Sequence, residues 1–228
     1  MQEPPLPQPT PAPSEVSDSV RLQILATEHW SLLATRSMTW NEMFTRAGMF
    51  LTVLSASVVA LALVAQATDF GENFRVFALL ILPIVLLLGI GTFIRLGDAQ
   101  EEDVGLVIGM NRLRHAYLEL APELEPYFVT GSTDDMAGVA QTYGGELNLR
   151  PSRILASTPA LVGIINAVLA GVLAAIVTAV LGGTSLVYIL AGVVAAVGSG
   201  VAIAAIPFRE ISRVRGAYRP RFPRKEQA

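Results

Sequence analysis

Residues 154–208 read ILASTPALVGIINAVLAGVLAAIVTAVLGGTSLVYILAGVVAAVGSGVAIAAIPF, which is 55 consecutive residues without Asp, Glu, Lys, Arg or His. About 20 apolar residues span the hydrocarbon core of a bilayer as an α-helix. The stretch is therefore long enough for two crossings, and Gly182-Gly183-Thr184-Ser185 supplies a turn signal between them. The sequence predicts transmembrane helices over 159–181 and 186–208.

Two shorter uncharged stretches precede this one, from Met49 to Thr68 and from Val76 to Ile94. Each is long enough for one crossing, near 48–68 and 76–95. Of the 228 residues, 52% are apolar and 15% charged, whereas soluble domains carry about 25% charged residues. This low charge also excludes a largely disordered chain. The predicted fold class is an all-α membrane protein with four transmembrane helices in two hairpins.

The basic residues predict the orientation. Among the 16 Lys and Arg residues, the loop 69–75 contains only Arg75 and the turn 182–185 contains none. The positive-inside rule places both termini and the central segment in the cytoplasm, with the two short turns outside. The basic residues are 15 Arg and one Lys, a bias that fits a GC-rich bacterial genome. The expected location is the bacterial inner (plasma) membrane, with several passes.

Two cytoplasmic stretches show helical periodicity outside the crossings. The first has a stripe at Leu22, Leu25, His29, Leu32, Arg36, Trp40 and Met43, and the second at Leu106, Met110, Leu113, Tyr117 and Leu120. Packed together as an antiparallel pair, they would form a helical stalk of about 35–40 Å. The alternative is that each helix lies on the lipid surface. The acidic residues argue against an anionic surface: Glu28, Glu42, Glu101, Glu102 and Asp103.

The expected organisation has six parts. They are a disordered Pro-rich tail (1–17), a cytoplasmic amphipathic helix (18–47), transmembrane hairpin 1 (48–95), a cytoplasmic helix and loop (96–158), transmembrane hairpin 2 (159–208) and a basic cytoplasmic tail (209–228). Pro122 and Pro126 should end the central helix. Residues 130–148, polar and rich in glycine, are expected to form a loop, and Pro83 should kink the second crossing.

Five short strings carry a resemblance to a known family: EHWSLL (28–33), WNE (40–42), RAGMF (46–50), GMNRLR (109–114) and YLELAP (117–122). Together they resemble a group of uncharacterised bacterial four-helix integral membrane proteins, from about residue 20 to 180. That group has no assigned activity, so the resemblance implies a layout and no catalytic residues. A looser likeness to two-helix bacterial effector membrane domains is architectural only.

Residues for catalysis are scarce. There is no cysteine, and the patterns HExxH, GxGxxG and GxxxxGK[ST] are absent. The two histidines, His29 and His115, have no ligand-spaced partner, and Asp134-Asp135 is one acidic pair rather than a calcium loop. We expect His29 to be a packed core residue and the acidic pair to be solvated. The sequence therefore predicts no catalytic, cofactor-binding or metal site, and a protein that is not an enzyme.

Two features of the crossings predict helix packing. Gly192, Ala196, Gly200 and Ala204 recur every four residues and would let another helix approach closely, either the third crossing or a second copy. Asn166 is the only amide well inside a crossing. Its expected role is an interhelical hydrogen bond, and the alternative is a polar ring in an oligomeric pore.

The C-terminal tail is strongly basic, through Arg209, Arg213, Arg215, Arg219, Arg221, Arg224 and Lys225. Beside a bilayer such a tail is expected to contact anionic lipid headgroups, and nucleic acid is the less favoured partner. A homo-oligomer and a cytoplasmic protein are the other partners considered. Two functions follow: a structural or scaffolding membrane protein, or a small oligomeric channel gated by the cytoplasmic helices. The uncharged crossings favour the first.

Overall fold

The computed structural model describes residues 16–144 and 157–224, and for 207–217 only the backbone. Within these ranges the regular structure is entirely helical, and the fold class is therefore confirmed as all-α. The elements are α1 (Asp18–Thr68), α2 (Glu72–Leu120), a 3-10 helix η1 (Pro122–Tyr127), α3 (Met136–Thr142), α5 (Thr158–Val180) and α6 (Ser185–Ala217).

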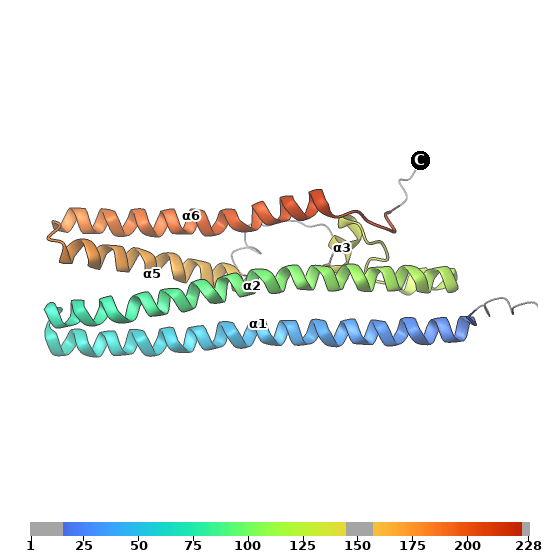
Figure 1. Ribbon diagram of the computed structural model, residues 1–228, viewed down its shortest axis with the longest axis horizontal. Helices are drawn as coiled ribbons and strands as arrows, with labels where there is room; N and C mark the ends of the chain where they lie inside the picture. Colours follow the sequence, from blue (N-terminus) through green and yellow to red (C-terminus); the bar gives the residue numbers. More distant parts are fainter. Residues whose placement is uncertain (1–15, 145–156, 225–228) are drawn as a thin grey trace, which may run out of the picture.

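Four of these helices, α1, α2, α5 and α6, are long and apolar enough to cross a membrane. Helices α1 and α2 contain the two shorter uncharged stretches, and α5 and α6 contain most of residues 154–208. Figure 1 shows them running along the long axis of the molecule, with α2 between α1 and α5, and α5 between α2 and α6. Because α5 accompanies only part of α2, the polar halves of α1 and α2 extend beyond it. The short α3 lies beside the polar half of α2.

Helix ends follow local chemistry. Helix α1 ends at Thr68, and Asp69 and Phe70 make the turn with φ of 47° and 57°. Helix α2 ends at Leu120, two residues before Pro122, the first residue of η1, as predicted. Proline has no N–H and its ring collides with the preceding turn, so it begins η1 rather than prolonging α2. Pro83 lies inside α2, which continues through it.

Helices α5 and α6 pack closely through small residues. A Cβ added to Gly171 would lie 2.7 Å from the Gly192 carbonyl oxygen and 2.8 Å from the Cβ of Ala196. A Cβ on Gly200 would lie 3.7 Å from Ala167. The stripe predicted on the fourth crossing therefore faces α5 of the same chain along three of its four residues. Ala204, the fourth, is exposed.

Part of the region 130–148 is helical, so the expectation of a loop there was wrong for Met136–Thr142. Helix α3 begins because the Asp135 carboxylate accepts a hydrogen bond from the Gly138 N–H at 2.8 Å, which caps the helix. Gly131 packs against the Gly138 backbone so closely that a Cβ on Gly131 would lie 2.2 Å from the carbonyl oxygen. Gly131 and Gly138, taken as a loop signal, serve close packing instead.

Candidate functional site

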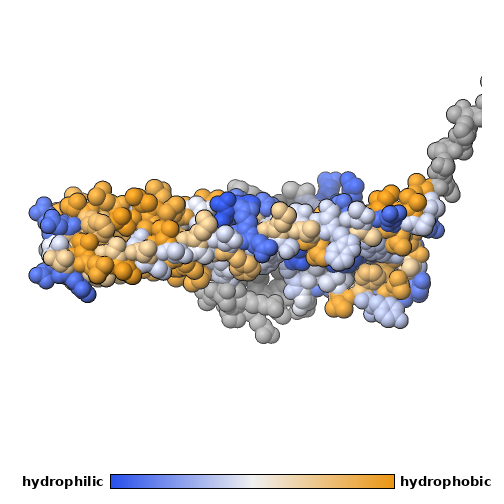
Figure 2. Space-filling model, turned by 90° about the horizontal axis from the view of Figure 1, so that it is seen from below, coloured by the Kyte–Doolittle hydropathy of each residue, from blue (hydrophilic) through white to orange (hydrophobic). Residues whose placement is uncertain are grey.

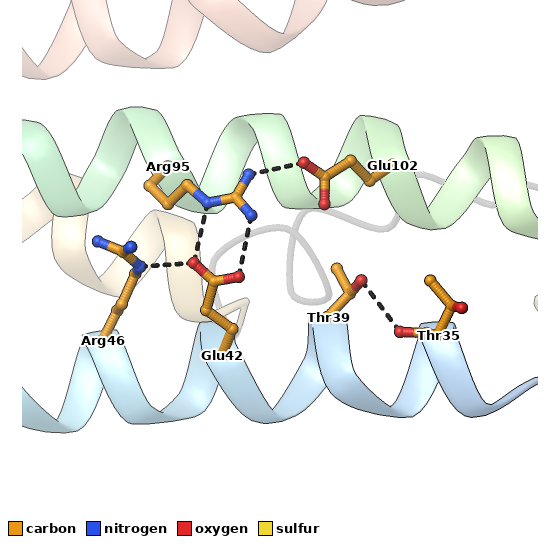
Figure 3. Close-up of polar contacts among 6 residues, drawn as sticks. All are labelled: Thr35, Thr39, Glu42, Arg46, Arg95 and Glu102. Carbon is orange, nitrogen blue, oxygen red and sulfur yellow. Dashed lines mark hydrogen bonds and ion pairs between the residues drawn. The ribbon is translucent and has the colours of Figure 1, made fainter.

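The uncharged and polar halves of α1 and α2 meet at a cluster of surface ion pairs (Figure 3). Arg95 of α2 donates two hydrogen bonds to Glu42 of α1, at 3.0 and 3.1 Å, and one to Glu102 at 2.7 Å. Arg46 donates to Glu42 at 2.8 Å. The hydrogen bonds from Arg95 and then Arg46 hold the pKa of Glu42 at about 2. Since solvent screens such pairs, the cluster fixes register more than it adds stability.

Beyond this cluster, a buried carboxylate joins three segments. Asp103 of α2 is 3% exposed. Its Oδ1 accepts hydrogen bonds from Arg36 Nε at 2.6 Å and from the Trp40 indole N–H at 3.0 Å. Its Oδ2 accepts from the Tyr143 hydroxyl at 2.5 Å. The Asp103 carboxylate therefore ties α1 and the residue after α3 to α2.

The environment of Asp103 is complementary to its charge. The Arg36 guanidinium also lies over the Tyr143 ring, 5.6 Å from its centroid. Burial, together with the hydrogen bond to Asp103, raises the pKa of Tyr143 and keeps its hydroxyl a donor. Removing one member of a buried, hydrogen-bonded charge pair strongly destabilises a protein. The sequence analysis used Asp103 only as one of the acidic residues that disfavour an anionic surface, and it did not predict this burial.

A second buried carboxylate holds the C-terminal segment. Asp134 is 0% exposed, although the sequence predicted a solvated acidic pair. Its oxygens accept from Arg112 Nε (2.8 Å), the Tyr218 hydroxyl (3.0 Å) and the backbone N–H groups of Arg221 (2.9 Å) and Phe222 (2.8 Å). Hydrogen bonds to an ionised carboxylate are among the stronger ones in proteins.

The neighbouring carboxylate completes this attachment. Asp135 Oδ2 accepts from the Arg224 N–H at 2.8 Å, while its Oδ1 caps α3. The Asp134 N–H donates back to the Phe222 carbonyl oxygen at 3.2 Å, and the Phe222 ring lies 4.5 Å from His115 of α2. Residues 218–224, which we call the docked segment, are thus bound mainly through their backbone. The basic composition of the tail did not predict that its backbone would bind to the rest of the chain.

The docked segment contains half-buried aromatic residues and exposed basic ones. The side chains of Arg219, Arg221 and Arg224 are exposed. Arg209, Arg213 and Arg215 belong to α6, but their side chains lie outside the described part of the chain, as does Lys225. Arg112, which binds Asp134, is 17 residues beyond Arg95 on α2, or about 25 Å along the helix.

Polar groups next to α3 are also satisfied. Asn111, 0% exposed, donates to the Thr133 carbonyl oxygen at 2.9 Å and accepts from the Thr142 hydroxyl and from Arg114 Nη1, both at 2.8 Å. Burial and then the charge of Arg36 lower the pKa of Arg114. This network binds the 131–142 segment to α2 beside Asp134.

The histidines make aromatic contacts. His29 of α1 stacks on Tyr117 of α2 with ring centroids 5.8 Å apart, and burial, with the charge of Arg114, lowers the pKa of His29. His115 lies 3.6 Å from Glu119, four residues later on α2, so the expectation that it has no carboxylate at helical spacing was wrong. Within the described ranges, no group of three or more His, Cys, Asp or Glu residues could hold a metal ion.

Asn166 lies in the interface between α5 and α2. It is 2% exposed, and neither Nδ2 nor Oδ1 has a hydrogen-bond partner among the described residues. A Cβ on Gly89 would lie 1.9 Å from its Oδ1 and 2.8 Å from the Phe50 ring. The amide therefore packs into space left by a glycine, and its two polar atoms are enclosed by the chain itself.

Comparison with family models, with curated proteins and with solved structures finds no match for the chain. The resemblance to the four-helix membrane family stays a prediction, and the function has to be argued from the geometry.

Proposed function

We propose that the protein is a non-enzymatic integral membrane protein with a structural, scaffolding role in the bacterial inner membrane. Its four crossings form two hairpins, and the polar halves of α1 and α2 form a cytoplasmic stalk. The observation that carries this proposal is the pair of buried carboxylates, Asp103 and Asp134. They fix α1, α2, the α3 segment and the docked segment to one another, which suits a rigid projection that positions a binding surface.

The arginines of the docked segment supply such a surface. Arg219, Arg221 and Arg224 are held about 25 Å beyond the level of Arg95, measured along α2. Electrostatic attraction to lipid decays within a Debye length, about 8–10 Å. We therefore assign these three arginines to an acidic protein partner. Contact with anionic lipid headgroups is assigned to Arg209, Arg213 and Arg215, which follow the fourth crossing directly.

The alternative function, an oligomeric pore, requires polar groups that face a lumen. The hydroxyls of Ser57, Thr92 and Thr178 instead donate to carbonyl oxygens four residues earlier, each at 2.8 Å. The amide of Asn166 is enclosed between α5 and α2. Both observations support the scaffold over the pore.

A conductance measurement separates the two functions. Purified protein reconstituted in planar bilayers is expected to give no single-channel steps, because the four predicted crossings contain no charged residue except Arg95 at the end of the second. Asn166→Leu serves as the matched variant, since it removes the buried amide of the third crossing. Ohmic steps in the parent that disappear in Asn166→Leu would contradict the scaffold and establish the pore.

Cysteine labelling tests the topology, because the chain has no native cysteine. Asn73→Cys, in the first turn of α2, is expected to react with an impermeant maleimide on intact cells. Gln100→Cys, which is also exposed, should react only after lysis. Both positions are on the same helix, α2, and differ in the side of the membrane on which they are predicted to lie. Reaction of both on intact cells would remove the two-hairpin topology.

A further inference from the structure

Helix α1 has a continuous face that no other part of the described chain covers. Its positions follow strict four-three spacing over 33 residues: Trp30, Ala34, Ser37, Asn41, Phe44, Gly48, Leu51, Ser55, Val58 and Ala62. We call this set the α1 seam. All its members are exposed except Leu51, which is half-buried. Four of the five buried residues of α1, Thr39, Met43, Ala47 and Phe50, lie on a different face, and the fifth, Ala65, lies beyond the end of the seam.

The exposure of the seam is large for apolar side chains. Trp30 is 71% exposed, Phe44 57% and Val58 55%. A Cβ added to Gly48 would meet no atom within 4 Å. Figure 2, seen from the side of α1, shows apolar surface on both sides of a hydrophilic patch about midway along the molecule. The seam therefore leaves apolar area uncovered in the half predicted to be in water as well as in the half predicted to be in lipid.

The spacing indicates the kind of partner. A repeat averaging 3.5 residues keeps one face of a helix against another in a left-handed coiled coil. In the crossing, the seam has small residues seven apart, at Gly48, Ser55 and Ala62, which allow close approach of helices in lipid. In the stalk it has aromatic residues, whose burial is favourable in water. A partner that covers the whole seam must itself be a helix that crosses the membrane and continues into the cytoplasm.

We propose that the occupant is α1 of a second copy, paired in parallel around a two-fold axis along the membrane normal. All copies share one orientation in the membrane, so such a pair places identical residues opposite each other. That requires a seam without charge, and none of its ten residues is charged. Asn41, its one amide, meets its own counterpart, and a single Asn in such a seam fixes register. This inference rests on the proposed membrane topology.

Cysteine cross-linking in native membranes tests the pairing. Ser37→Cys and Ser55→Cys lie in the seam, and Ser31→Cys and Ser57→Cys lie on other faces of α1 at similar heights. All four changes are nearly isosteric and there is no competing cysteine. Mild oxidation is expected to give disulfide-linked dimers at 37 and 55 only, because a disulfide needs Cα atoms about 4.4–6.8 Å apart. Equal yields at all four positions, or no dimer at 37 and 55, would overturn the proposal.

A second variant tests the close approach without disturbing the monomer. Gly48→Leu has open space within the chain and should lower the dimer fraction in vesicles about tenfold. Gly91→Leu on α2, whose Cβ would also meet open space, is the control and should leave it unchanged. An unchanged dimer fraction in Gly48→Leu would exclude this face. Because the labelling of Asn73→Cys and Gln100→Cys reports topology alone, failure of the dimer and failure of the membrane arrangement are distinguishable.

Discussion

Asp134→Asn is expected to release the docked segment while the long helices stay intact. The carboxylate of Asp134 accepts four hydrogen bonds, two of them from the backbone of Arg221 and Phe222. An amide offers one acceptor oxygen, and its NH₂ group would face the N–H donors of the segment. Breaking such a buried charged contact costs about 3–5 kcal/mol. The contacts that remain include the Arg224 N–H to Asp135, the Phe222 carbonyl oxygen to the backbone of residue 134, and the Phe222 ring beside His115.

Limited proteolysis measures the release. Trypsin cleavage after Arg221 is expected to accelerate by about 100-fold in Asp134→Asn, because cleavage follows the population of the open form. Asp98→Asn, an exposed acidic residue on α2, is the matched control and should be cleaved like the parent. Equal cleavage of Asp134→Asn and the parent would show that the carboxylate does not hold the segment.

The same contact has a defined pH dependence. Burial opposes ionisation of Asp134 and of Asp135, but hydrogen bonds, first from backbone N–H groups that include those of the docked segment and then from side chains, together lower both pKa values. A carboxyl group with a lowered pKa in the folded state stabilises that state above its ordinary pKa, and this contribution is lost as pH falls through the lowered value. The protection factor of the Phe222 amide, which compares its exchange with that of an unstructured amide at the same pH, should therefore stay high from neutral pH to about pH 4 and fall only below it.

The sequence predicted those features of the fold that depend on residues close together in the chain. Uncharged stretches of about 20 residues predict crossings because the hydrocarbon thickness sets the length, and Pro122 predicts the end of α2 because proline cannot continue a helix. The binding of the docked segment could not be predicted from the sequence. Asp134 and Phe222 are 88 residues apart, and backbone N–H groups can bind a carboxylate whatever side chains the segment carries. No periodicity records such a contact.

Asp103 is a different case, because the sequence contained a usable signal. It precedes Leu106 by three residues and Met110 by seven, so it lies on the apolar stripe of α2. Arg36 lies on the apolar stripe of α1 in the same way. Two opposite charges on two stripes that are predicted to face each other indicate a buried pair. The argument about the lipid surface used only the charge of Asp103 and overlooked its position on the helix.

That pair gives the prediction with the largest effect on the stalk. Asp103→Leu is expected to lower the free energy of unfolding of the polar halves of α1 and α2 by about 3–5 kcal/mol, because it leaves the charge of Arg36 without its buried partner. The uncharged halves should remain protected, since their packing centres on other residues, such as Phe50 and Leu82. Hydrogen exchange along α1 and α2 in detergent measures both effects at once.

The control for Asp103→Leu removes a charged side chain of the same two helices that is not buried. Glu42→Gln removes a partner of Arg95 in the surface cluster, where solvent screens the interaction, so exchange should remain close to that of the parent. The double variant Arg36→Met/Asp103→Leu then separates two explanations for the loss in Asp103→Leu. If the loss comes from an unpaired buried charge, removing Arg36 as well restores much of the protection, because an apolar pair can replace a buried ion pair. If the double variant is as unprotected as the single one, the hydrogen bonds of Trp40 and Tyr143 to the carboxylate hold the stalk together instead.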